Sequence, residues 1–313
     1  MNDPERYHGI VVLDKPAGMT SHDVVDRARR LFRTKRVGHT GTLDPDATGV
    51  LVLCLGQATR LAEYLSASRK HYVTTVVFGV ETATQDASGA VIAERDAGFL
   101  TAERVAALLP RFRGTILQVP PMVSARHHQG KRLYELAREG VTVEREARPV
   151  EIYALEMTGF TPGTHPTATL EVTCSTGTYI RTLAADLGSA LEVGGMMQTL
   201  RRTRVGDERH AFALQDAHSL EDLQQRAEAG TLETVIVSLA QATAAWPQAR
   251  LRPEQVARIR NGQEIALCDI AGWETSGDLP GEPVAILDEA GLFAAVGKIA
   301  FGRLLPVKVL AQL

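Results

Sequence analysis

The sequence is poor in cysteine, with only three among 313 residues. Cys54, Cys174 and Cys268 are isolated from one another, and each lies in an apolar stretch. An odd number of isolated cysteines excludes a disulfide framework and provides no zinc-ligand spacing. We therefore expect all three thiols to pack in the core, and we expect no metal site. The pattern favours a protein from a reducing compartment.

The sequence also shows no long hydrophobic run, either near its start or elsewhere. Residues 1–8 are charged, so we predict no signal peptide, and no stretch approaches the ~20 apolar residues of a membrane span. No glycine-rich loop is followed by Lys-Ser or Lys-Thr, as in phosphate-cradling nucleotide sites. A composition of 44% hydrophobic and 23% charged residues indicates a globular protein with a large core. We expect a cytoplasmic protein that does not associate with membranes.

The chain carries little net charge, −3, so the whole molecule gives no sign of a polyanionic partner. Two local clusters are nevertheless basic: Arg27, Arg29, Arg30, Arg33, Lys35 and Arg36 form the first, and Arg201, Arg202 and Arg204 the second. A local basic surface can bind phosphates even when the total charge is negative. A solvated helix face is the alternative explanation of such clusters.

Hydrophobic periodicity divides the chain into strands and helices that do not alternate regularly. We expect strands at 9–13, 71–80, 91–94, 150–158, 168–174 and 196–205, and a strand or helix start at 50–55. We expect helices at 24–32, 59–65, 131–139 and 179–190, and one following Thr101. This order favours an α+β fold over a parallel α/β sheet. A boundary near Trp246 separates a small, mostly β tail, in line with about two domains for this length.

The most distinctive segment is residues 38–49, Gly-His-Thr-Gly-Thr-Leu-Asp-Pro-Asp-Ala-Thr-Gly. Three glycines and a proline restrict the loop, because Gly reaches positive φ and Pro locks φ. Such a loop can hold Asp44 in one geometry, as a nucleophile or a base requires. His39, five residues before it, is a possible second participant. An ordinary turn, in which Asp44 bonds its own backbone, is the alternative.

Further motifs accompany this loop. They are Gly-Ile-Val-Val-Leu-Asp-Lys-Pro-Ala-Gly-Met-Thr-Ser at 9–21, Lys-His-Tyr at 70–72, Gly-Lys-Arg-Leu-Tyr at 130–134, Ser-Thr-Gly-Thr-Tyr-Ile-Arg at 175–181 and Leu-Arg-Arg-Thr-Arg at 200–204. Through them the chain resembles the TruB family of bacterial tRNA pseudouridine synthases over nearly its whole length. The resemblance implies an α+β catalytic domain with a mixed, largely antiparallel sheet over 1–245, and a small β-rich RNA-binding domain of the PUA type over 246–313.

The resemblance also implies a reaction. A uridine in the T-loop of tRNA, normally uridine 55, is isomerised to pseudouridine: the bond from C1′ to N1 breaks, the base rotates, and C1′ rejoins at C5. No cofactor or metal is needed. The expected partner is the T-arm of tRNA, and we expect a monomer without protein partners. Because a stacked base cannot reach a buried carboxylate, the target base must be flipped out.

Site residues follow from the same resemblance. Asp44 matches the family's catalytic aspartate, which would add to C6 of the ring or attack C1′; both routes stay open. Either route needs an ionised carboxylate, and Arg181 matches the arginine that pairs with it. The further matching positions are Tyr72 (base stacking), Tyr179 (pocket), Leu200 (apolar wall), His39 (space left by the flipped base) and Lys15 (support of the loop or a phosphate). Ordinary packing or solvent exposure is the alternative for each of them.

Basic residues in the matching regions are expected to contact the RNA backbone: Arg36, Arg126, Lys131, Arg132, Arg201, Arg202 and Arg204. Such contacts position RNA without carrying sequence information. The chain departs from the family pattern at Ala83, Val123 and His127, positions that support or contact RNA more than they affect the chemistry of Asp44.

Two other functions compete with this interpretation. Asp44-Pro-Asp-Ala-Thr48 fits the signature of phosphohydrolases of the HAD type, which use an aspartyl-phosphate and Mg²⁺. That signature should follow an apolar strand, and here it follows a Gly-Thr-rich segment. A protein that mainly binds and refolds tRNA is the second alternative, and it can coexist with catalysis.

Overall fold

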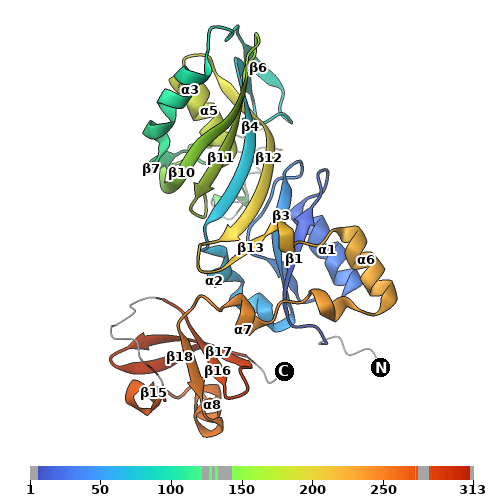
Figure 1. The fold of residues 1–313 in the computed structure, drawn as a ribbon, viewed down its shortest axis with the longest axis vertical. Coiled ribbons are helices and arrows are strands. Elements are labelled where there is room, and N and C mark those ends of the chain that lie inside the picture. The colour runs from blue at the N-terminus through green and yellow to red at the C-terminus, as the bar shows by residue number, and fades with distance from the viewer. Residues whose placement is uncertain are drawn as a thin grey trace. The chain divides into compact units, whose positions relative to one another are not determined.

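The computed structural model describes residues 6–121, 127–128, 131–132, 143–271, 273 and 282–310, with backbone alone at 127–128 and 131–132. The chain folds into two compact units (Figure 1). One contains Met1–Pro45, Val50–Ser66 and Gly206–Leu313, and the other contains Asp46–Gly49 and Ala67–Val205. We call them unit 1 and unit 2.

Unit 2 is organised around an antiparallel sheet. Its strands run in the order β12 (Gly195–Gly206), β4 (Lys70–Phe78), β11 (Thr167–Cys174), β10 (Arg148–Thr161) and β7 (Gly114–Gln118). One parallel step joins β12 to the start of β3 (Thr48–Leu55), where Arg201 lies opposite Thr48. The sheet is therefore mixed but largely antiparallel, as expected from the sequence.

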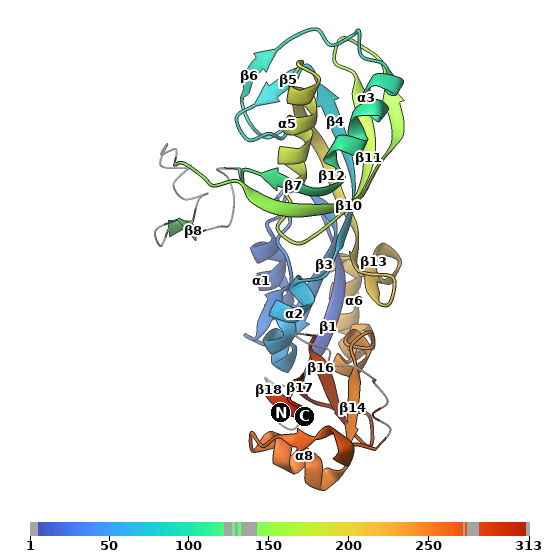
Figure 2. The same cartoon turned by 90° about the vertical axis from the view of Figure 1, so that its left-hand side faces the viewer.

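Helices and a hairpin complete unit 2. Helix α3 (Ala102–Leu108) contacts β10 and continues as the 3₁₀ turn η2 (Leu109–Phe112), while α5 (Ile180–Ala190) contacts β4. Both helices lie on the same side of the sheet (Figure 2). The short strands β5 (Val80–Thr82) and β6 (Val91–Glu94) form a hairpin, and β8 (His127–His128) pairs with β9 (Lys131–Arg132).

Unit 1 contains a first hydrophobic core formed from both ends of its sequence. Strands β1 (Gly9–Lys15), β2 (Val37–His39) and β3 pack with α1 (Ser21–Leu31) and α6 (Leu220–Ala229). Smaller elements surround them: η1 (Gly56–Leu61), α2 (Ala62–Ser66), β13 (Ala211–Ala213), η3 (Leu214–Asp216), η4 (Leu232–Val235) and α7 (Leu239–Ala242). Val24, Val25 and Ala28 bury one face of α1 in this core.

The C-terminal part of unit 1 has a second core of its own, from Ala249 to Leu304. A five-stranded sheet runs in the order β14 (Gln248–Leu251), β16 (Val284–Asp288), β17 (Phe293–Ala300), β18 (Arg303–Val309) and β15 (Ile265–Ala266). Helix α8 (Pro253–Arg260) and the turn η5 (Leu267–Asp269) complete it. A separate core supports a C-terminal domain. That this domain begins near Trp246 stays a prediction.

Contacts join this C-terminal sheet to α2 and the turn before it. Arg60 donates from Nη1 to the carbonyl of Val309 at 2.6 Å, and Lys308 forms an ion pair with Glu63. The rings of Tyr64 and Trp246 meet edge to face at 5.7 Å. These contacts explain why residues 206–313 and the N-terminal segments form one compact unit.

Several local expectations are corrected. The expected helix at 59–65 is a 3₁₀ turn followed by five residues of α2. The expected strand at 71–80 is interrupted at Gly79, whose φ is +88° and where a Cβ would lie 2.5 Å from the carbonyl oxygen of Arg95. The helix expected at 131–139 begins instead as strand β9, and residues 133–139 lie outside the described residues.

Two of the three thiols are buried, and one is not. Cys54 and Cys174 are enclosed, and burial raises the pKa of the first to about 12 and of the second to about 11. Cys268 is exposed on η5, so the expectation of core packing was wrong at this position. An apolar neighbourhood in the sequence does not show which way a side chain points in a short 3₁₀ turn.

Over the ranges that the structure describes, no helix is both long enough and apolar enough to span a membrane. Within the same ranges, no group of three or more His, Cys, Asp or Glu side chains is placed to hold a metal ion.

Candidate active site

The loop that carries Asp44 is anchored on its C-terminal side by Lys15. The Lys15 side chain is fully buried, and its Nζ donates to the carbonyls of Pro16 at 2.7 Å and Pro45 at 2.8 Å. The N–H of Gly18 donates to the same Pro45 oxygen at 3.0 Å. Lys15 therefore supports the loop, as one of its two expected roles required, and it does not lie on the surface.

Ser21 anchors the other side of Asp44. The hydroxyl of this buried serine accepts from the N–H of Leu43 at 2.9 Å and donates to the Leu43 carbonyl at 3.0 Å. The residues before and after Asp44 are therefore both bonded to the segment that joins β1 to α1. The Asp44 side chain itself is half-buried. A carboxylate mounted this way loses little conformational entropy when it meets a substrate.

His39 ends β2, directly before this loop. Its Nδ1 accepts a hydrogen bond from the N–H of Gly41 at 3.3 Å, which assigns the neutral-state proton to Nε2. The N–H of Thr40 donates to the Val52 carbonyl on β3 at 3.1 Å. The half-buried imidazole is thus oriented by the backbone of its own loop.

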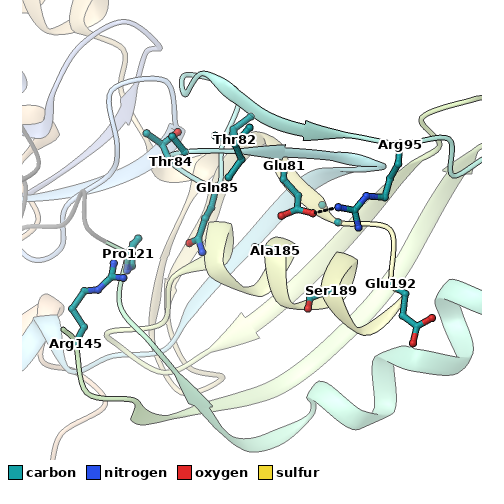
Figure 3. Close-up of a pocket in the computed structure, with 14 residues that line it drawn as sticks. Glu81, Thr82, Thr84, Gln85, Arg95, Pro121, Arg145, Ala185, Ser189 and Glu192 are labelled. Carbon is teal, nitrogen blue, oxygen red and sulfur yellow. Dashed lines mark ion pairs between the residues drawn. The ribbon is translucent and has the colours of Figure 1, made fainter. Parts of the chain in front are cut away.

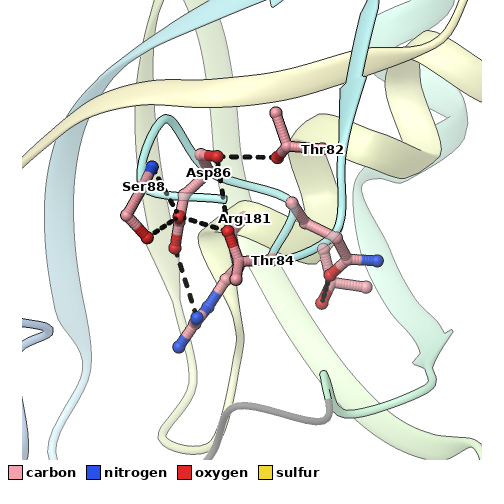
Figure 4. Close-up of polar contacts among 7 residues, drawn as sticks. Thr82, Thr84, Asp86, Ser88 and Arg181 are labelled. Atoms are coloured by element: carbon pink, nitrogen blue, oxygen red, sulfur yellow. Dashed lines mark hydrogen bonds and ion pairs between the residues drawn. The ribbon is translucent and has the colours of Figure 1, made fainter. Parts of the chain in front are cut away.

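In unit 2, Arg181 forms an ion pair with Asp86. Nη1 of Arg181 lies 3.3 Å from Oδ2 of Asp86, and the two side chains are 5% and 14% exposed. Figure 4 shows the guanidinium beside the turn that follows β5. Arg181 lies in the first turn of α5, which Tyr179 precedes as the N-cap. The pairing of Arg181 with Asp44 that the sequence suggested is a proposal, considered below.

The other oxygen of Asp86 holds its own turn together. Oδ1 accepts from the Thr84 hydroxyl at 2.6 Å and from the N–H and hydroxyl of Ser88 at 3.1 and 2.6 Å. Thr82 bonds the Asp86 carbonyl at 2.6 Å (Figure 4). The residue before it, Gln85, has a φ of +65°, a conformation that persists only where surrounding contacts impose it.

Sequence reasoning did not single out Asp86 as the partner of Arg181. A turn aspartate that bonds nearby N–H groups is a common local pattern. Nothing in the sequence around Asp86 indicates that it also forms an ion pair with Arg181. Its partner Arg181 lies 95 positions further along the chain. The family motif that ends at Arg181 was the available signal that this guanidinium has a buried carboxylate partner.

Strand β4 and strand β12 bring Tyr72, Leu200 and Arg202 to one face of the sheet. Tyr72 lies opposite Arg202 in register, and Leu200 lies opposite Thr74, two residues beyond Tyr72. Tyr72 is 9% exposed and Leu200 is half-buried. Paired residues and residues two apart share a face of a sheet. The tyrosine and the leucine expected in one pocket therefore lie on the same surface.

Arg202 is 2% exposed, so its side chain lies inside the protein. A buried guanidinium does not suit a surface contact with RNA phosphates, and for this residue we replace that expectation with an internal role. Arg201 is half-buried and donates to the Thr48 hydroxyl at 3.1 Å, and Arg204 is also half-buried. Arg36 is exposed together with Arg27, Arg30, Arg33 and Lys35. The side chains of Arg126, Lys131 and Arg132 lie outside the described residues.

Lys70, the first residue of β4, is also buried, and sequence reasoning did not single it out. It is 5% exposed, and its Nζ donates to the Ser68 carbonyl at 2.6 Å. Burial, with a smaller contribution from the charge of Arg202, lowers the pKa of Lys70 to about 8. Unit 2 therefore holds two buried cations near the strand positions that carry Tyr72.

A polar cavity of about 370 Å³ also lies in unit 2, beside the hairpin of β5 and β6 (Figure 3). Thr82, Ala83, Thr84 and Gln85 line one side of it, and Glu81 pairs across its rim with Arg95 at 3.2 Å. None of the expected site residues that the structure describes lines this cavity.

Comparison with solved structures defines the class of fold. The chain superimposes on a chain of a crystallised Cbf5–Nop10–Gar1 complex with a TM-score of 0.74 and 25% identity, covering 99% of this chain and 87% of that one. A chain of an H/ACA ribonucleoprotein bound to a substrate RNA containing 2′-deoxyuridine has a TM-score of 0.71 at 24% identity, covering 99% and 89%. The α+β catalytic fold with a β-rich C-terminal part is therefore that of the pseudouridine synthases.

Sequence comparison then identifies the family. Residues 29–180 match the N-terminal domain of the TruB family pseudouridylate synthases, and residues 181–243 match the C-terminal domain of tRNA pseudouridylate synthase B. The tRNA pseudouridine synthase B of Pelotomaculum thermopropionicum is 44% identical over 92% of this chain and 90% of its own length. That of Symbiobacterium thermophilum is 55% identical over 69% and 71%. This chain belongs to the TruB family of pseudouridylate synthases.

Membership decides between the two enzyme classes considered from the sequence. The phosphohydrolase interpretation of Asp44-Pro-Asp-Ala-Thr48 is not supported, because the chain belongs to another family. The strand before the motif, β2, has three residues and pairs antiparallel with β3. The match to that signature is a coincidence of a short motif.

Proposed function

We propose that this chain is a tRNA pseudouridine synthase, an isomerase that converts uridine 55 in the T-arm of tRNA to pseudouridine. The observation that carries the proposal is the double anchoring of the Asp44 loop, through Ser21 on one side and Lys15 on the other. A rigidly mounted carboxylate on the family's catalytic position is what a covalent or electrostatic role at the uridine requires.

The reaction needs this carboxylate ionised when it meets the base. Partial burial favours the neutral acid, and a nearby guanidinium opposes that tendency. We propose that Arg181 supplies this charge to Asp44 in the complex with tRNA, while Asp86 keeps the guanidinium oriented at 3.3 Å. Arg181 would then be shared between a structural carboxylate and the reacting one.

The bonds that change define what Asp44 has to do. The bond from C1′ to N1 breaks, the bond from C1′ to C5 forms, C5 loses its hydrogen and N1 gains one, so that substrate and product are isomers. Asp44 would add to C6 of the ring or attack C1′ after cleavage, and both routes conserve atoms. Tyr72, which would pack on the flipped base, would also handle the C5 proton.

The base must leave its stack to reach Asp44. We propose that Tyr72, Tyr179 and Leu200 form the walls of its pocket, and that His39 occupies the space left in the RNA. Aromatic residues make up only 5% of the chain, so few other side chains can stack on the uracil. The shared sheet face of Tyr72 and Leu200 supports this assignment.

Exposed cations support the binding of the RNA backbone. Arg27, Arg30, Arg33, Lys35 and Arg36 are all exposed on α1 and the turn after it. We propose that this basic surface, with Arg201 and Arg204, contacts phosphates, and that recognition of the T-arm depends mainly on shape and splayed bases. The C-terminal domain, of the PUA type, would add to the grip. We further propose a monomer that acts in the cytoplasm, without a cofactor or a metal.

Replacement of Asp44 tests the proposal directly. We expect Asp44→Asn to lower kcat by at least about 10³-fold, because the neutral amide lacks the nucleophilic charge. Unmodified tRNA transcript is incubated with enzyme, and the product is mapped by carbodiimide modification and primer extension. Affinity for tRNA, measured by filter binding, should stay within about twofold of the wild type.

Asp46→Asn is the matched control, since Asp46 is an exposed carboxylate two residues further along the same loop. We expect it to keep kcat within about threefold of the wild type. Equal losses in both variants, or a loss of tRNA affinity that parallels the loss of turnover in Asp44→Asn, would contradict the catalytic assignment.

A second role in refolding tRNA is favoured by the same exposed basic surface, which can hold RNA without performing chemistry. Asp44→Asn separates the two functions. We expect this variant to accelerate the refolding of a misfolded tRNA transcript, followed by native-gel electrophoresis, at the wild-type rate. No acceleration by either protein removes this second role.

A further inference from the structure

Helix α5 begins at a residue that is a poor helix cap. Its N-cap is Tyr179, whose side chain makes no capping hydrogen bond. Ser, Thr, Asp or Asn at this position would stabilise the helix by about 1 kcal/mol relative to residues without a capping oxygen. A tyrosine here indicates that the position serves something other than helix stability, and that another part of the chain must fix where the helix starts.

Gln118 is the residue that fixes it. This glutamine ends β7, is 2% exposed and lies 61 positions before Tyr179. Its side-chain Oε1 accepts from the N–H of Tyr179 at 3.0 Å, and its Nε2 donates to the carbonyl of Tyr179 at 3.2 Å. The same carbonyl also accepts the first hydrogen bond of the helix, from the N–H of Leu183 at 3.1 Å.

These two bonds hold both peptide groups that flank the Cα of Tyr179. The N–H belongs to the peptide plane before the Cα, and the carbonyl belongs to the plane after it. With both planes held, φ and ψ at Tyr179 are fixed, and so is the direction in which its side chain leaves the backbone. Arg181 follows two residues later in the first turn of α5, so its direction depends on the same bonds.

The contacts of Gln118 continue along the start of α5. Arg181 pairs with Asp86 at 3.3 Å, and the Thr182 hydroxyl donates to Oε1 of Gln85 at 3.0 Å. Three of four consecutive residues are therefore fixed by side chains from other elements. Of these three side chains, Gln118 alone bonds the backbone. It comes from β7, which is an edge strand of the sheet.

We propose that Gln118 is a positioning residue for the isomerisation. Its amide sets the backbone of Tyr179 and thereby orients Tyr179 and Arg181 toward the flipped uracil and Asp44. The inference rests on the proposed function, in which both residues serve the base pocket. Loss of the amide should lower kcat more than it changes KM for tRNA, because the affinity for tRNA comes mainly from the basic surfaces.

The experiment compares two substitutions of nearly equal size, Gln118→Leu and Gln118→Glu. Gln118→Leu removes both hydrogen bonds, and we expect kcat to fall by about 10- to 100-fold with KM within about twofold. Gln118→Glu keeps the acceptor but, when ionised, has no donor for the Tyr179 carbonyl. When protonated it regains one donor and one acceptor, the pattern of the native amide.

The pH dependence of Gln118→Glu therefore distinguishes positioning from general damage. Burial raises the pKa of a carboxyl group, so the protonated form gains as pH falls through the range of about 8 to 5.5. We expect the ratio of kcat in Gln118→Glu to that of the wild type to rise as pH falls. The corresponding ratio for Gln118→Leu should stay flat, since leucine does not titrate.

Gln255→Leu is a matched control. Gln255 is also a buried glutamine, 4% exposed, and it also bonds backbone on both sides, accepting from the N–H of Arg252 at 3.0 Å and donating to the Asp269 carbonyl at 2.8 Å. It belongs to α8, in unit 1. We expect a comparable loss of thermal stability with kcat within about twofold of the wild type.

The outcomes separate this inference from the proposed function. If the wild type forms no pseudouridine in tRNA, the proposed function fails. If the wild type is active and Gln118→Leu keeps the wild-type kcat, the positioning role of Gln118 is overturned while the function stands. The same holds if Gln255→Leu lowers kcat as much as Gln118→Leu does. A loss in Gln118→Glu that does not change with pH also overturns it.

Discussion

At the scale of single residues, Asp86 divides its two oxygens between two tasks. Oδ1 closes its own turn through Thr84 and Ser88, and Oδ2 meets the guanidinium of Arg181. A hydrogen-bonded turn with an imposed positive φ at Gln85 gives this carboxylate a fixed position. Asp86 thus places a negative charge beside the buried Arg181 and helps to set the direction of its guanidinium.

Replacement of Asp86 by Asn should therefore affect Arg181 and spare the turn. The amide oxygen can keep the bonds to Thr84 and Ser88, but the ion pair with Arg181 is lost. We expect kcat to fall by about 10- to 100-fold, since the buried guanidinium loses the carboxylate that orients it. Single-turnover measurements on tRNA transcript report this loss.

Ser88→Ala serves as the control for Asp86→Asn, because it removes one bond to Oδ1 and leaves the ion pair intact. We expect its kcat within about threefold of the wild type. A larger loss in Ser88→Ala than in Asp86→Asn would mean that the turn matters and the ion pair does not.

Lys70 should destabilise the folded protein near neutral pH. Its pKa is lowered to about 8 in the folded state from 10.5, so the unfolded chain binds the proton more tightly. The free energy of unfolding should then rise with pH between these values, as the buried amine becomes neutral. Lys70→Met removes the buried charge and should be more stable than the wild type at pH 7, by on the order of 2–3 kcal/mol.

Denaturant unfolding of both proteins between pH 7 and 10.5 tests this sign. The advantage of Lys70→Met should shrink as pH rises and should disappear near the pKa of the unfolded lysine, about 10.4. A variant that is less stable than the wild type at pH 7 would show that the bond to Ser68 and the other contacts of Lys70 outweigh the desolvation of its charge.

At the scale of elements, local signals were predictable and long-range ones were not. Thr20 and Asp23 are a local sequence signal for the start of helix α1, and in the structure they form its capping box. The motif at 38–49 likewise predicted a restricted loop that carries Asp44. Lys15, which bonds Pro45 in this loop, and Gln118, which bonds Tyr179 at the start of α5, lie 30 and 61 positions from their partners. Periodicity and turn rules carry no information over such separations.

The burial of basic residues was the part of the site that the sequence concealed. Arg201, Arg202 and Arg204 form one cluster along the chain, yet alternate positions on β12 face opposite sides, and Arg202 is enclosed. A run of basic residues on a strand forms a continuous basic surface only if both faces of the strand are exposed to solvent. On α1, Arg27 and Arg30 were exposed as predicted, whereas Arg29 is half-buried and bonds Asp26 and the Val37 carbonyl.

Two glycines at element ends should respond differently to alanine. Gly49, the second residue of β3, has a φ of +103°, and a Cβ there would lie 2.8 Å from the backbone nitrogen of Arg202 on the paired strand. Gly18 has a φ of +79° with open space around a Cβ. We expect Gly49→Ala to lower the free energy of unfolding by about 3 kcal/mol or more. We expect Gly18→Ala to lower it by about 1 kcal/mol, because only the strain of the positive φ acts there.

Thermal unfolding followed by circular dichroism compares these variants. Equal shifts in Tm would show that the parallel pairing of β3 with β12 tolerates a side chain at Gly49, contrary to the approach seen at Arg202. Gly18→Ala is the natural control, because it shares the positive φ and lacks the steric contact.

At the scale of the whole molecule, a net charge of −3 conceals a concentrated cationic surface. Five exposed cations lie on α1 and the turn after it, so the affinity for tRNA should depend steeply on salt. Replacing Arg30, Arg33 and Arg36 by Gln should weaken binding across all tRNA sequences. The slope of log K against log salt should become shallower by about one for each phosphate that these arginines neutralise in the wild type.

Arg104→Gln with Arg111→Gln is the control for these substitutions, since both arginines are exposed on α3 and η2, outside the expected RNA surface. We expect the salt slope of this double variant to match that of the wild type. An unchanged slope in the triple variant would remove the basic surface of α1 from the RNA interface.

The enclosure of Lys15 has a practical consequence for chemical footprinting. An amine with no exposed surface and two carbonyl partners should resist acylation while the exposed lysine Lys35 reacts. Acetylation of Lys15, followed by mass spectrometry, would then report the moments when the segment around Asp44 detaches from β1. The reactivity of Lys15 would thus show how often its bond to Pro45 opens in the free protein and with tRNA added.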